Sequence, residues 1–508
     1  MRSSGEVGWL AWRARLAPNQ TCLIYNRVAA TYAQMADASA KLAVALAHAG
    51  VGPGQGVAML TRNTPSNMAM LFASQAAGFW LSPLNSRLTA SELAHQLAVL
   101  QPSAVVADAA FAELAAESIA EGTATTLMTV DEWGSSLGSP LGRSRRRALS
   151  EAGPLSRPDG DPIILVLFTS GTTGRPKAVT LTRSNLYASA AASAMHLGVA
   201  PDDRWLCCLP LHHVGGLSIL IRSVLFGHTV ILHPDFDAAR VTSDITRHAA
   251  TMISLVPTTL GRLLDQPGDP EWTKGLRCVL VGGAACPGDL LDRALSIGIP
   301  ALTTYGLTES CSQVATAPPG SRPPQKATGL PLPAVEVRIE GAQENATGQG
   351  PGEILIRGPM VSPGQLDSGR LVPGLTDGWL ATGDLGWQDS DGWLYLQDRR
   401  SDLIVSGGEN IMPSEVEAAI IRHPAVREAL VYGLDDPQWG QSVAAAVVLQ
   451  PEASMDMASL RDHLQQLLAG YKIPRRLVIT DSLPMTTSGK VSRSQMRRLD
   501  AKGNLKST

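Results

Sequence analysis

The sequence predicts an α/β protein. A large N-terminal domain of mixed, largely parallel sheets with flanking helices is expected to precede a small α+β domain. The chain of 508 residues is too long for a single hydrophobic core, so two or more domains are expected. Segments typical of helices and of strands alternate over roughly the first three hundred residues, which is the pattern of βαβ units. After about residue 320, Pro and Gly become frequent and short strands predominate.

Local patterns define the elements of the N-terminal domain. Thr31 and Gln34 form a capping box, which opens an alanine-rich helix that stops near Gly50. A second capping box, Thr89–Glu92, opens another helix. Short apolar runs are typical of buried strands, and a third helix lies between two of them. The strands expected on this basis are Val57–Leu60, Ala104–Ala107, Cys278–Val281 and Ala301–Thr304, and the third helix is Asp289–Leu295.

The last part of the chain has a different character. Short strands at Val335–Glu340 and Glu353–Arg357 predict a small β subdomain that completes the large domain, residues 1–398. The charged stretch Asp398–Asp402 suits a linker, so residues 399–508 are expected to form a separate, mobile α+β domain. A capping box at Ser414 and Glu417 predicts its first helix. The other expected elements are strands at Leu430–Gly433 and Ala444–Leu449 and a helix at Leu460–Leu468.

Composition excludes several classes of protein. A net charge of −3 gives no global field that favours nucleic acid or an anionic membrane. No apolar run approaches the about 18 residues of a spanning helix, and the N-terminus lacks the apolar region of a secretory signal. A soluble cytoplasmic protein is expected, and homo-oligomers are left open. The cysteines form no C-x-x-C pair, so neither a zinc site nor a disulfide framework is expected; they are Cys22, Cys207, Cys208, Cys278, Cys286 and Cys311.

The most informative segment is Thr169–Lys177, which follows the strand-like run Ile163–Phe168. It gathers hydroxyls, two glycines and a lysine in nine residues. A strand that leads into such a loop presents N–H groups, hydroxyls and a cation to an oxyanion, which is the chemistry of polyphosphate binding. Ala178 follows the lysine where a Walker A loop requires Ser or Thr, so a conventional P-loop ATPase is disfavoured.

Four further segments offer chemistry, although each is weak alone. Tyr305–Glu309 follows a strand and combines an aromatic ring, a hydroxyl and a carboxylate at the edge where parallel sheets bind ligands. The turn Thr382–Asp384 holds a carboxylate that can accept both hydroxyls of a ribose. His212–Gly216 contains adjacent histidines, which are expected to point in different directions and to form a pocket wall rather than a metal site. Thr487–Lys490 places a lysine on a loop near the C-terminus.

Taken in order, these segments resemble the adenylate-forming superfamily, which contains acyl-CoA synthetases, luciferases and the adenylation domains of peptide synthetases. The resemblance covers essentially the whole chain, at fitting spacing. It rests on Thr169–Lys177, His213, Tyr305–Glu309, Thr382–Asp384, Arg399–Gly408 and Gly489–Lys490. One departure is Val361–Gly369, which lacks the Gly-Tyr pair that many members have after the equivalent of Arg357–Pro359. We therefore expect this loop to be shortened or remodelled relative to other members.

The resemblance implies an AMP-forming acid–thiol ligase that uses ATP, Mg²⁺ and coenzyme A. It implies a hinge near Ser401, catalytic roles for Lys177, Thr308, Glu309 and Lys490, and Glu309 as the ligand of Mg²⁺. The residues implied to bind ATP or coenzyme A are Thr169, Ser170, Gly171, Thr172, Thr173, Gly174, Gly283, Ala284, Thr304, Tyr305, Gly306, Asp384, Arg399, Gly407 and Gly408. Those implied to bind the small carboxylic acid are His213, Ser218, Gly282, Cys311, Ser312 and Gln313.

A narrower resemblance is to the ligases that join o-succinylbenzoate to coenzyme A in menaquinone and phylloquinone biosynthesis. It rests on Leu209–Ser218, Thr304–Gln313 and Arg400–Ile411. This acid carries a second carboxylate that needs a partner when buried. Ser218, Ser312 and Gln313 are candidate neutral donors and Arg222 is a candidate cation, although Arg222 could equally be a surface residue on a helix. One alternative is a related aryl- or short-chain acyl-CoA ligase. The other is a non-catalytic nucleotide-binding paralogue, which the presence of Glu309 and Lys490 disfavours.

Overall fold

The computed structural model of the protein describes residues 8–121, 123–138, 160–169, 176–267, 271–341, 351–397, 403–484 and 493–501. The chain divides into two compact units. The first ends at Leu396 and the second begins at Gln397, and two short segments, Arg87–Gln96 and Thr169–Lys177, group with the second. The predicted domain boundary between residues 398 and 399 and the predicted hinge at Ser401 lie outside the described residues.

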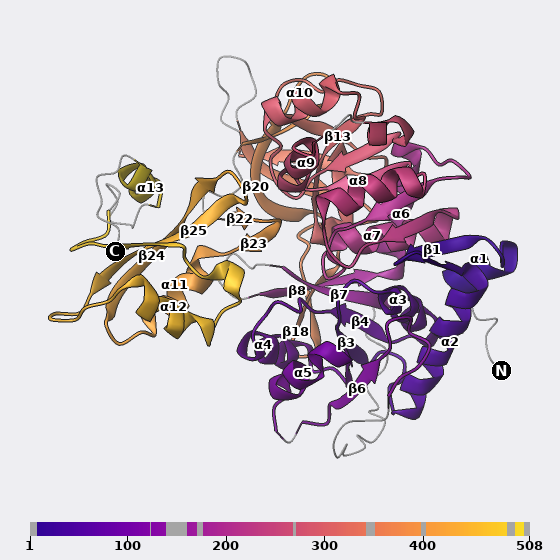
Figure 1. Ribbon diagram of the computed structural model, residues 1–508, viewed down its shortest axis with the longest axis horizontal. Coiled ribbons are helices and arrows are strands. Elements are labelled where there is room, and N and C mark those ends of the chain that lie inside the picture. Colours follow the sequence, from indigo (N-terminus) through magenta and orange to yellow (C-terminus); the bar gives the residue numbers. More distant parts are fainter. Residues whose placement is uncertain are drawn as a thin grey trace. The chain divides into compact units, whose positions relative to one another are not determined.

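Two sheets form the framework of the first unit (Figure 1). The larger has the strand order β16-β17-β20-β21-β15-β14-β13-β12-β11-β9-β10-β1-β2, and the smaller has the order β19-β18-β8-β7-β4-β3-β5-β6. In the larger sheet the neighbours from β13 to β1 are parallel, as the alternation of helices and strands predicts. The strands of the larger sheet are β1 (Thr21–Tyr25), β2 (Val28–Thr31), β9 (Arg204–Cys207), β10 (Thr229–Leu232), β11 (Met252–Leu255), β12 (Cys278–Val281), β13 (Ala301–Leu307), β14 (Ser312–Thr316), β15 (Ala327–Pro331), β16 (Glu336–Glu340), β17 (Gly352–Arg357), β20 (Leu380–Gln388) and β21 (Leu394–Gln397). Those of the smaller sheet are β3 (Gly56–Leu60), β4 (Trp80–Pro83), β5 (Ala104–Asp108), β6 (Thr126–Val130), β7 (Ile163–Thr169), β8 (Lys177–Thr182), β18 (Gly364–Asp367) and β19 (Arg370–Pro373).

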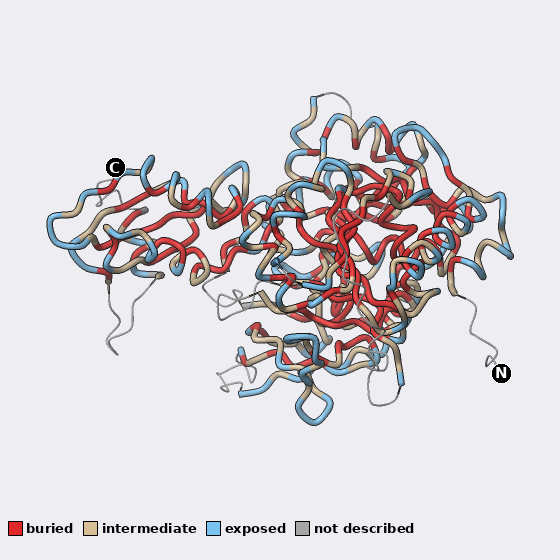
Figure 2. The backbone as a smooth tube through the Cα atoms, turned by 90° about the horizontal axis from the view of Figure 1, so that it is seen from below, coloured by how far each residue is buried: buried red, intermediate tan, exposed pale blue. Residues whose placement is uncertain are grey.

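The main hydrophobic core of this unit combines side chains of both sheets with side chains of the helices α2, α3, α6 and α7. A second core covers the other face of the larger sheet and includes side chains of α8, α9 and α10. The parallel strands are buried on both faces, as parallel sheets covered by helices require. Figure 2 shows the buried residues in red. The helices are α1 (Trp9–Leu16), α2 (Tyr32–His48), α3 (Pro65–Ala77), α4 (Ala90–Leu100), α5 (Ala112–Ser118), α6 (Arg183–Leu197), α7 (Val214–Phe226), α8 (Ala238–Arg247), α9 (Pro257–Leu264) and α10 (Gly288–Ser296).

The loop that departs from the superfamily pattern has a definite place in this framework. Gly364–Asp367 forms β18, which pairs antiparallel with β8 and with β19. The chain between residues 361 and 373 therefore extends the smaller sheet, next to the strand that begins at Lys177.

A five-stranded sheet is the centre of the second unit. Side chains of α11 and α12 form one hydrophobic core with this sheet, and Met496 of α13 belongs to a second, smaller core. The elements are β22 (Ile404–Ser406), β23 (Glu409–Ile411), β24 (Val426–Asp436), β25 (Gly440–Leu449), β26 (Arg476–Ile479), α11 (Pro413–Ile421), α12 (Met457–Gln465) and α13 (Arg493–Ala501). Within the described residues, no helix is both long and apolar enough to cross a membrane.

The capping box predicted at Ser414 and Glu417 is wrong. The helix α11 begins two residues earlier than this capping box predicts, with Met412 at the N-cap and Pro413 as its first residue. Within the described part of the chain, the Ser414 hydroxyl has no hydrogen-bond partner. Glu417 accepts from the Val431 backbone N–H at 2.9 Å and from Arg493 at 2.8 Å. The carboxylate thus ties the helix to other elements of the unit instead of capping it.

Candidate active site at the carboxyl edge of the larger sheet

Three predicted segments follow parallel strands of the larger sheet and therefore lie at the same edge of it. The segment that contains His213 follows β9, the Gly282–Ala284 turn follows β12, and Thr308–Glu309 follows β13. In an open α/β sheet, ligands bind at this carboxyl edge. The tertiary structure thus brings together candidate residues that lie up to about a hundred positions apart in the sequence.

Asp384 is held in place by a partner that the sequence did not reveal. The carboxylate is buried and accepts a hydrogen bond from the Tyr305 hydroxyl at 2.7 Å. The Asp384 backbone N–H donates to the Thr382 hydroxyl, which donates to the Ile354 carbonyl at 2.7 Å. Tyr305 itself is buried in a small apolar core. The Tyr305 hydroxyl therefore fixes one carboxylate oxygen of Asp384, whatever contact its ring makes with a nucleotide.

The turn that carries Glu309 is tightly constrained. Thr308–Ser310 forms one turn of 3₁₀ helix between β13 and β14, and the Glu309 carbonyl accepts from the Ser362 N–H at 2.7 Å. Cys311 and Ser312 have φ values of 56° and 119°, which non-glycine residues adopt only at a cost. This backbone places the Ser312 carbonyl against Gly306, where an added Cβ would lie 1.6 Å from the oxygen. The chain needs glycine at position 306 to close this turn.

The two histidines after β9 do not point in different directions, contrary to the prediction. Their ring centroids lie 4.3 Å apart with an angle of 54° between the ring planes. His213 is the N-cap residue of α7 and is partly buried. A residue without a sequence motif supports this segment: Asn63, which follows β3 of the smaller sheet, hydrogen-bonds to the backbone at Leu209 and Leu211.

Arg222 lies two turns along α7 and is 3% exposed. Its Nη2 donates to Gln313 Oε1 at 2.9 Å, and its guanidinium lies 5.3 Å from the ring centroid of Trp205. Burial lowers the pKa of Arg222 to about 10, so the side chain stays charged at neutral pH. Its Nε has no partner, and no carboxylate in the described part of the chain forms an ion pair with it. A buried cation without a counter-ion is costly, so this position suits an anionic group brought by a ligand.

Two other predicted acid-binding residues, Ser218 and Gln313, lie on the same helix as this cation or contact it directly. Ser218 precedes Arg222 by one helical turn on α7, and its hydroxyl donates to the Gly215 carbonyl at 3.0 Å. Gln313 is buried on β14 and also donates to the Thr316 hydroxyl at 2.8 Å. Cys311 is fully buried and belongs to the main core. Ser218, Arg222 and Gln313 thus form one polar group in apolar surroundings.

Several predicted residues lie outside the described part of the chain. Thr169 ends β7 and Lys177 begins β8, and the residues between them that were predicted to bind phosphate are Ser170, Gly171, Thr172, Thr173 and Gly174. Arg399 and Lys490 are likewise outside the described residues. Their roles remain predictions from the family resemblance.

In the second unit, Gly407 and Gly408 form the turn between β22 and β23. The Gly407 N–H donates to the Trp439 carbonyl at 2.8 Å, and Arg475 lies 5.1 Å from the centroid of the Trp439 ring. Among the described residues, the Trp439 indole N–H has no hydrogen-bond partner. Sequence reasoning missed Trp439 and Arg475, because neither belongs to a motif. The one signal in the sequence was that Trp439 stands directly before Gly440.

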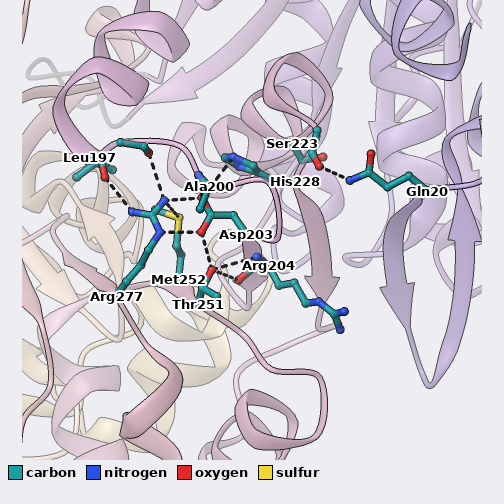
Figure 3. Close-up of polar contacts among 12 residues, drawn as sticks. Gln20, Leu197, Ala200, Asp203, Arg204, Ser223, His228, Thr251, Met252 and Arg277 are labelled. Carbon is teal, nitrogen blue, oxygen red and sulfur yellow. Dashed lines mark hydrogen bonds and ion pairs between the residues drawn. The ribbon is translucent and has the colours of Figure 1, made fainter. Parts of the chain in front are cut away.

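A partly buried ion pair at the opposite edge of the larger sheet is structural (Figure 3). Arg277 donates to both carboxylate oxygens of Asp203, at 2.7 and 2.5 Å, and the Thr251 hydroxyl donates to Asp203 at 2.9 Å. Burial raises the pKa of Asp203, but the hydrogen bonds from Arg277 outweigh it and hold the pKa below its usual range. These residues precede β9, β11 and β12, so they lie at the amino edge, away from the candidate site.

This arrangement of sheets and edge residues defines a class of protein. The chain belongs to the AMP-binding enzyme family: residues 10–366 match that family, and residues 415–490 match the AMP-binding enzyme C-terminal domain. Among its relatives is a 2-succinylbenzoate–CoA ligase of Bacillus subtilis, 37% identical over 97% of this chain and 98% of the relative.

Solved structures agree with this assignment. The o-succinylbenzoate CoA synthetase of Bacillus subtilis, as a double mutant bound to a product analogue, superposes with a TM-score of 0.83 at 34% identity and covers 97% of this chain and 98% of its own. The same synthetase in complex with ATP and magnesium ion has a TM-score of 0.69 at 36% identity, covering 97% and 99% of the two chains.

Proposed function

We propose that the protein is an acid–CoA ligase that converts o-succinylbenzoate, ATP and coenzyme A to o-succinylbenzoyl-CoA, AMP and pyrophosphate. The observation that carries the choice of acid is the buried, charged Arg222, which lies near Ser218 and Gln313 and forms no ion pair with a carboxylate of the described residues. The decisive experiment incubates the protein with the three substrates and Mg²⁺ and measures the thioester by mass. A protein that forms other acyl-CoA esters but not this one would support the alternative of a related ligase.

In the first half-reaction a carboxylate oxygen attacks the α-phosphorus of ATP, the bond to the bridging oxygen breaks, and pyrophosphate leaves. A carboxylic acid with a pKa of about 4 is already ionised at neutral pH, so no general base is required. The difficulty is that an anion approaches a polyanion, and catalysis therefore consists mainly of positioning and charge neutralisation. Glu309 suits Mg²⁺ because carboxylate oxygen is a ligand that this ion prefers and because the turn around it is rigid.

Asp384 is proposed to accept hydrogen bonds from the ribose hydroxyls of ATP. We expect Asp384→Ala to raise KM for ATP about tenfold or more, since a hydrogen bond to a charged group contributes about 1.5–3 kcal/mol. KM for ATP and for its 2′-deoxy and 3′-deoxy analogues is measured from initial rates of pyrophosphate exchange. Asp384→Ala should raise KM for the analogues less than it raises KM for ATP. Tyr305→Phe, which removes only the hydroxyl bonded to Asp384, is the control for lost orientation. If Asp384→Ala kept the wild-type ratios of KM between ATP and each analogue, the ribose role of Asp384 would be excluded.

In the second half-reaction the thiol of coenzyme A loses its proton to solvent and its sulfur attacks the acyl carbonyl, whereupon AMP leaves. Gly407 and Gly408 are proposed to let the pantetheine arm pass close to the backbone. Trp439 and Arg475, beside Gly407, offer an aromatic face and a cation, which suit the adenine base and the phosphates of coenzyme A.

We expect Trp439→Ala and Arg475→Met each to raise KM for coenzyme A about tenfold, on the scale of one stacking or charge-assisted contact. Pyrophosphate exchange, which needs no coenzyme A, should stay at the wild-type rate. Arg427→Met is the matched control, because Arg427 is an exposed arginine of the same unit that pairs with Glu428. If the Trp439 and Arg475 variants have the same KM for coenzyme A as Arg427→Met, coenzyme A binds elsewhere.

A further inference from the structure

A single amide joins the carboxyl edges of the two sheets of the first unit. Asn63 follows β3 of the smaller sheet and is 7% exposed. Its Nδ2 donates to the Leu209 carbonyl at 2.9 Å and to the His233 carbonyl at 3.2 Å, and its Oδ1 accepts from the Leu211 N–H at 2.9 Å. Leu209 and Leu211 follow β9 and His233 follows β10, both of the larger sheet.

The loop that carries Asn63 is itself rigid. The Thr64 backbone N–H donates to Asn67 Oδ1 at 2.9 Å, and Asn67 Nδ2 donates to the Thr61 hydroxyl at 3.0 Å. Thr61, Thr64 and Asn67 are buried, and Asn67 lies in the first turn of α3. The Asn63 side chain therefore extends from a fixed base and is not a mobile surface amide.

On the other side, the amide holds the turn that leads to His213. The His213 N–H donates to the Pro210 carbonyl at 3.2 Å, and an added Cβ at Gly216 would lie 2.7 Å from the same oxygen. The Leu209–Leu211 backbone is thus fixed by α7 on one side and by Asn63 on the other. A shift of this backbone would move His213, the residue proposed to line the acid pocket.

We propose that Asn63 is a positioning residue for acid binding: it sets the place of the Leu209–His213 segment through its hydrogen bonds to Leu209 and Leu211, while a third hydrogen bond ties it to His233. The proposal rests on the proposed function in one respect, that His213 contacts the acid. A buried amide of this kind also contributes to stability, because its removal takes a hydrogen-bond partner from two carbonyls and one N–H. The experiment must therefore separate position from stability.

The control for stability is Thr251, at the amino edge of the same sheet. Its hydroxyl donates to Asp203 at 2.9 Å and accepts from the Arg204 N–H at 3.0 Å, so Thr251→Ala also removes partly buried hydrogen bonds without touching the site. We expect Asn63→Ala to raise KM for the acid about tenfold in pyrophosphate exchange, with KM for ATP changed by less than about twofold, because small displacements of a binding group are costly. Thr251→Ala should leave both values at wild type while lowering the melting temperature.

Deuterium exchange monitors the position directly, in the intact protein without substrate. Peptides that cover Leu209–His213 should exchange faster in Asn63→Ala than in wild type and in Thr251→Ala. If Asn63→Ala does not fold, Asn63→Asp serves instead. It keeps the acceptor for the Leu211 N–H, but when ionised it faces two carbonyls, and burial raises the pKa of such a carboxyl group. Its defect in KM for the acid should shrink as the pH falls, whereas wild type shows no such trend.

Unchanged exchange of the Leu209–His213 peptides in the Asn63 variants would overturn the proposal, as would an effect on the acid no larger than that of Thr251→Ala. Failure of the proposed function has a different signature. Wild type would then not form the thioester with o-succinylbenzoate, and the exchange experiment, together with kinetics on whichever acid supports pyrophosphate exchange, would still test Asn63.

Discussion

Replacing Arg222 with Met is expected to lower kcat/KM for o-succinylbenzoate about a hundredfold while the protein stays folded. Methionine fills a similar volume, and replacing a buried charge by an apolar group is often neutral for stability. Binding the acid, however, would then bury a carboxylate opposite no cation. Breaking a buried pair in this way costs about 3 kcal/mol or more, which corresponds to about a hundredfold. Steady-state kinetics with varied acid at saturating ATP measure the effect.

The test becomes specific when the substrate is changed along with the enzyme. Two monocarboxylic analogues of o-succinylbenzoate each lack one of its carboxylates, and only the analogue that keeps the reacting carboxylate can be adenylated. Arg222→Met should not slow that reaction further, since the group that Arg222 binds is already missing. Arg222→Lys should be intermediate, because lysine keeps the charge but not the planar fork that donates to Gln313. An equal loss on the diacid and on the analogue would mean that Arg222 only supports the core.

Lys490→Ala is expected to lower the rate of adenylate formation by at least about two orders of magnitude, the scale of one preorganised donor at a site of developing charge. The residue lies outside the described part of the chain, and its role comes from the resemblance of Gly489–Lys490 to the superfamily. Single-turnover formation of the acyl-adenylate gives the rate. Equilibrium binding of ATP should change far less, since the lysine is proposed to act on the α-phosphate and the bridging oxygen in the transition state.

Lys41→Ala is a suitable control for this experiment, because Lys41 is an exposed lysine on α2 that pairs with Asp37. It should form the adenylate at the wild-type rate. Normal adenylate formation by Lys490→Ala would remove Lys490 from the mechanism, whereas a matching loss of ATP affinity would assign it to ground-state binding.

The local elements were predictable where short-range chemistry decides them. The strand Cys278–Val281 has the predicted bounds, and the capping box at Thr31 and Gln34 makes both of its reciprocal hydrogen bonds. The same reasoning failed at Ser414, because Pro413 is favoured in the first turn of a helix and moved the start of α11. Glu417 was then taken by Val431 and Arg493, partners that lie 14 and 76 residues away.

By itself the sequence determined the class of fold, the family and the identity of the groups that carry the chemistry, since these depend on residue type and on spacing within short segments. Only the tertiary structure decided which groups touch: Tyr305 with Asp384, Arg222 with Gln313, and Asn63 with the turn before His213. These pairs are separated by 79, 91 and 146 residues. Such contacts depend on how whole strands and helices pack, and a pattern of neighbouring residues contains no information about that packing.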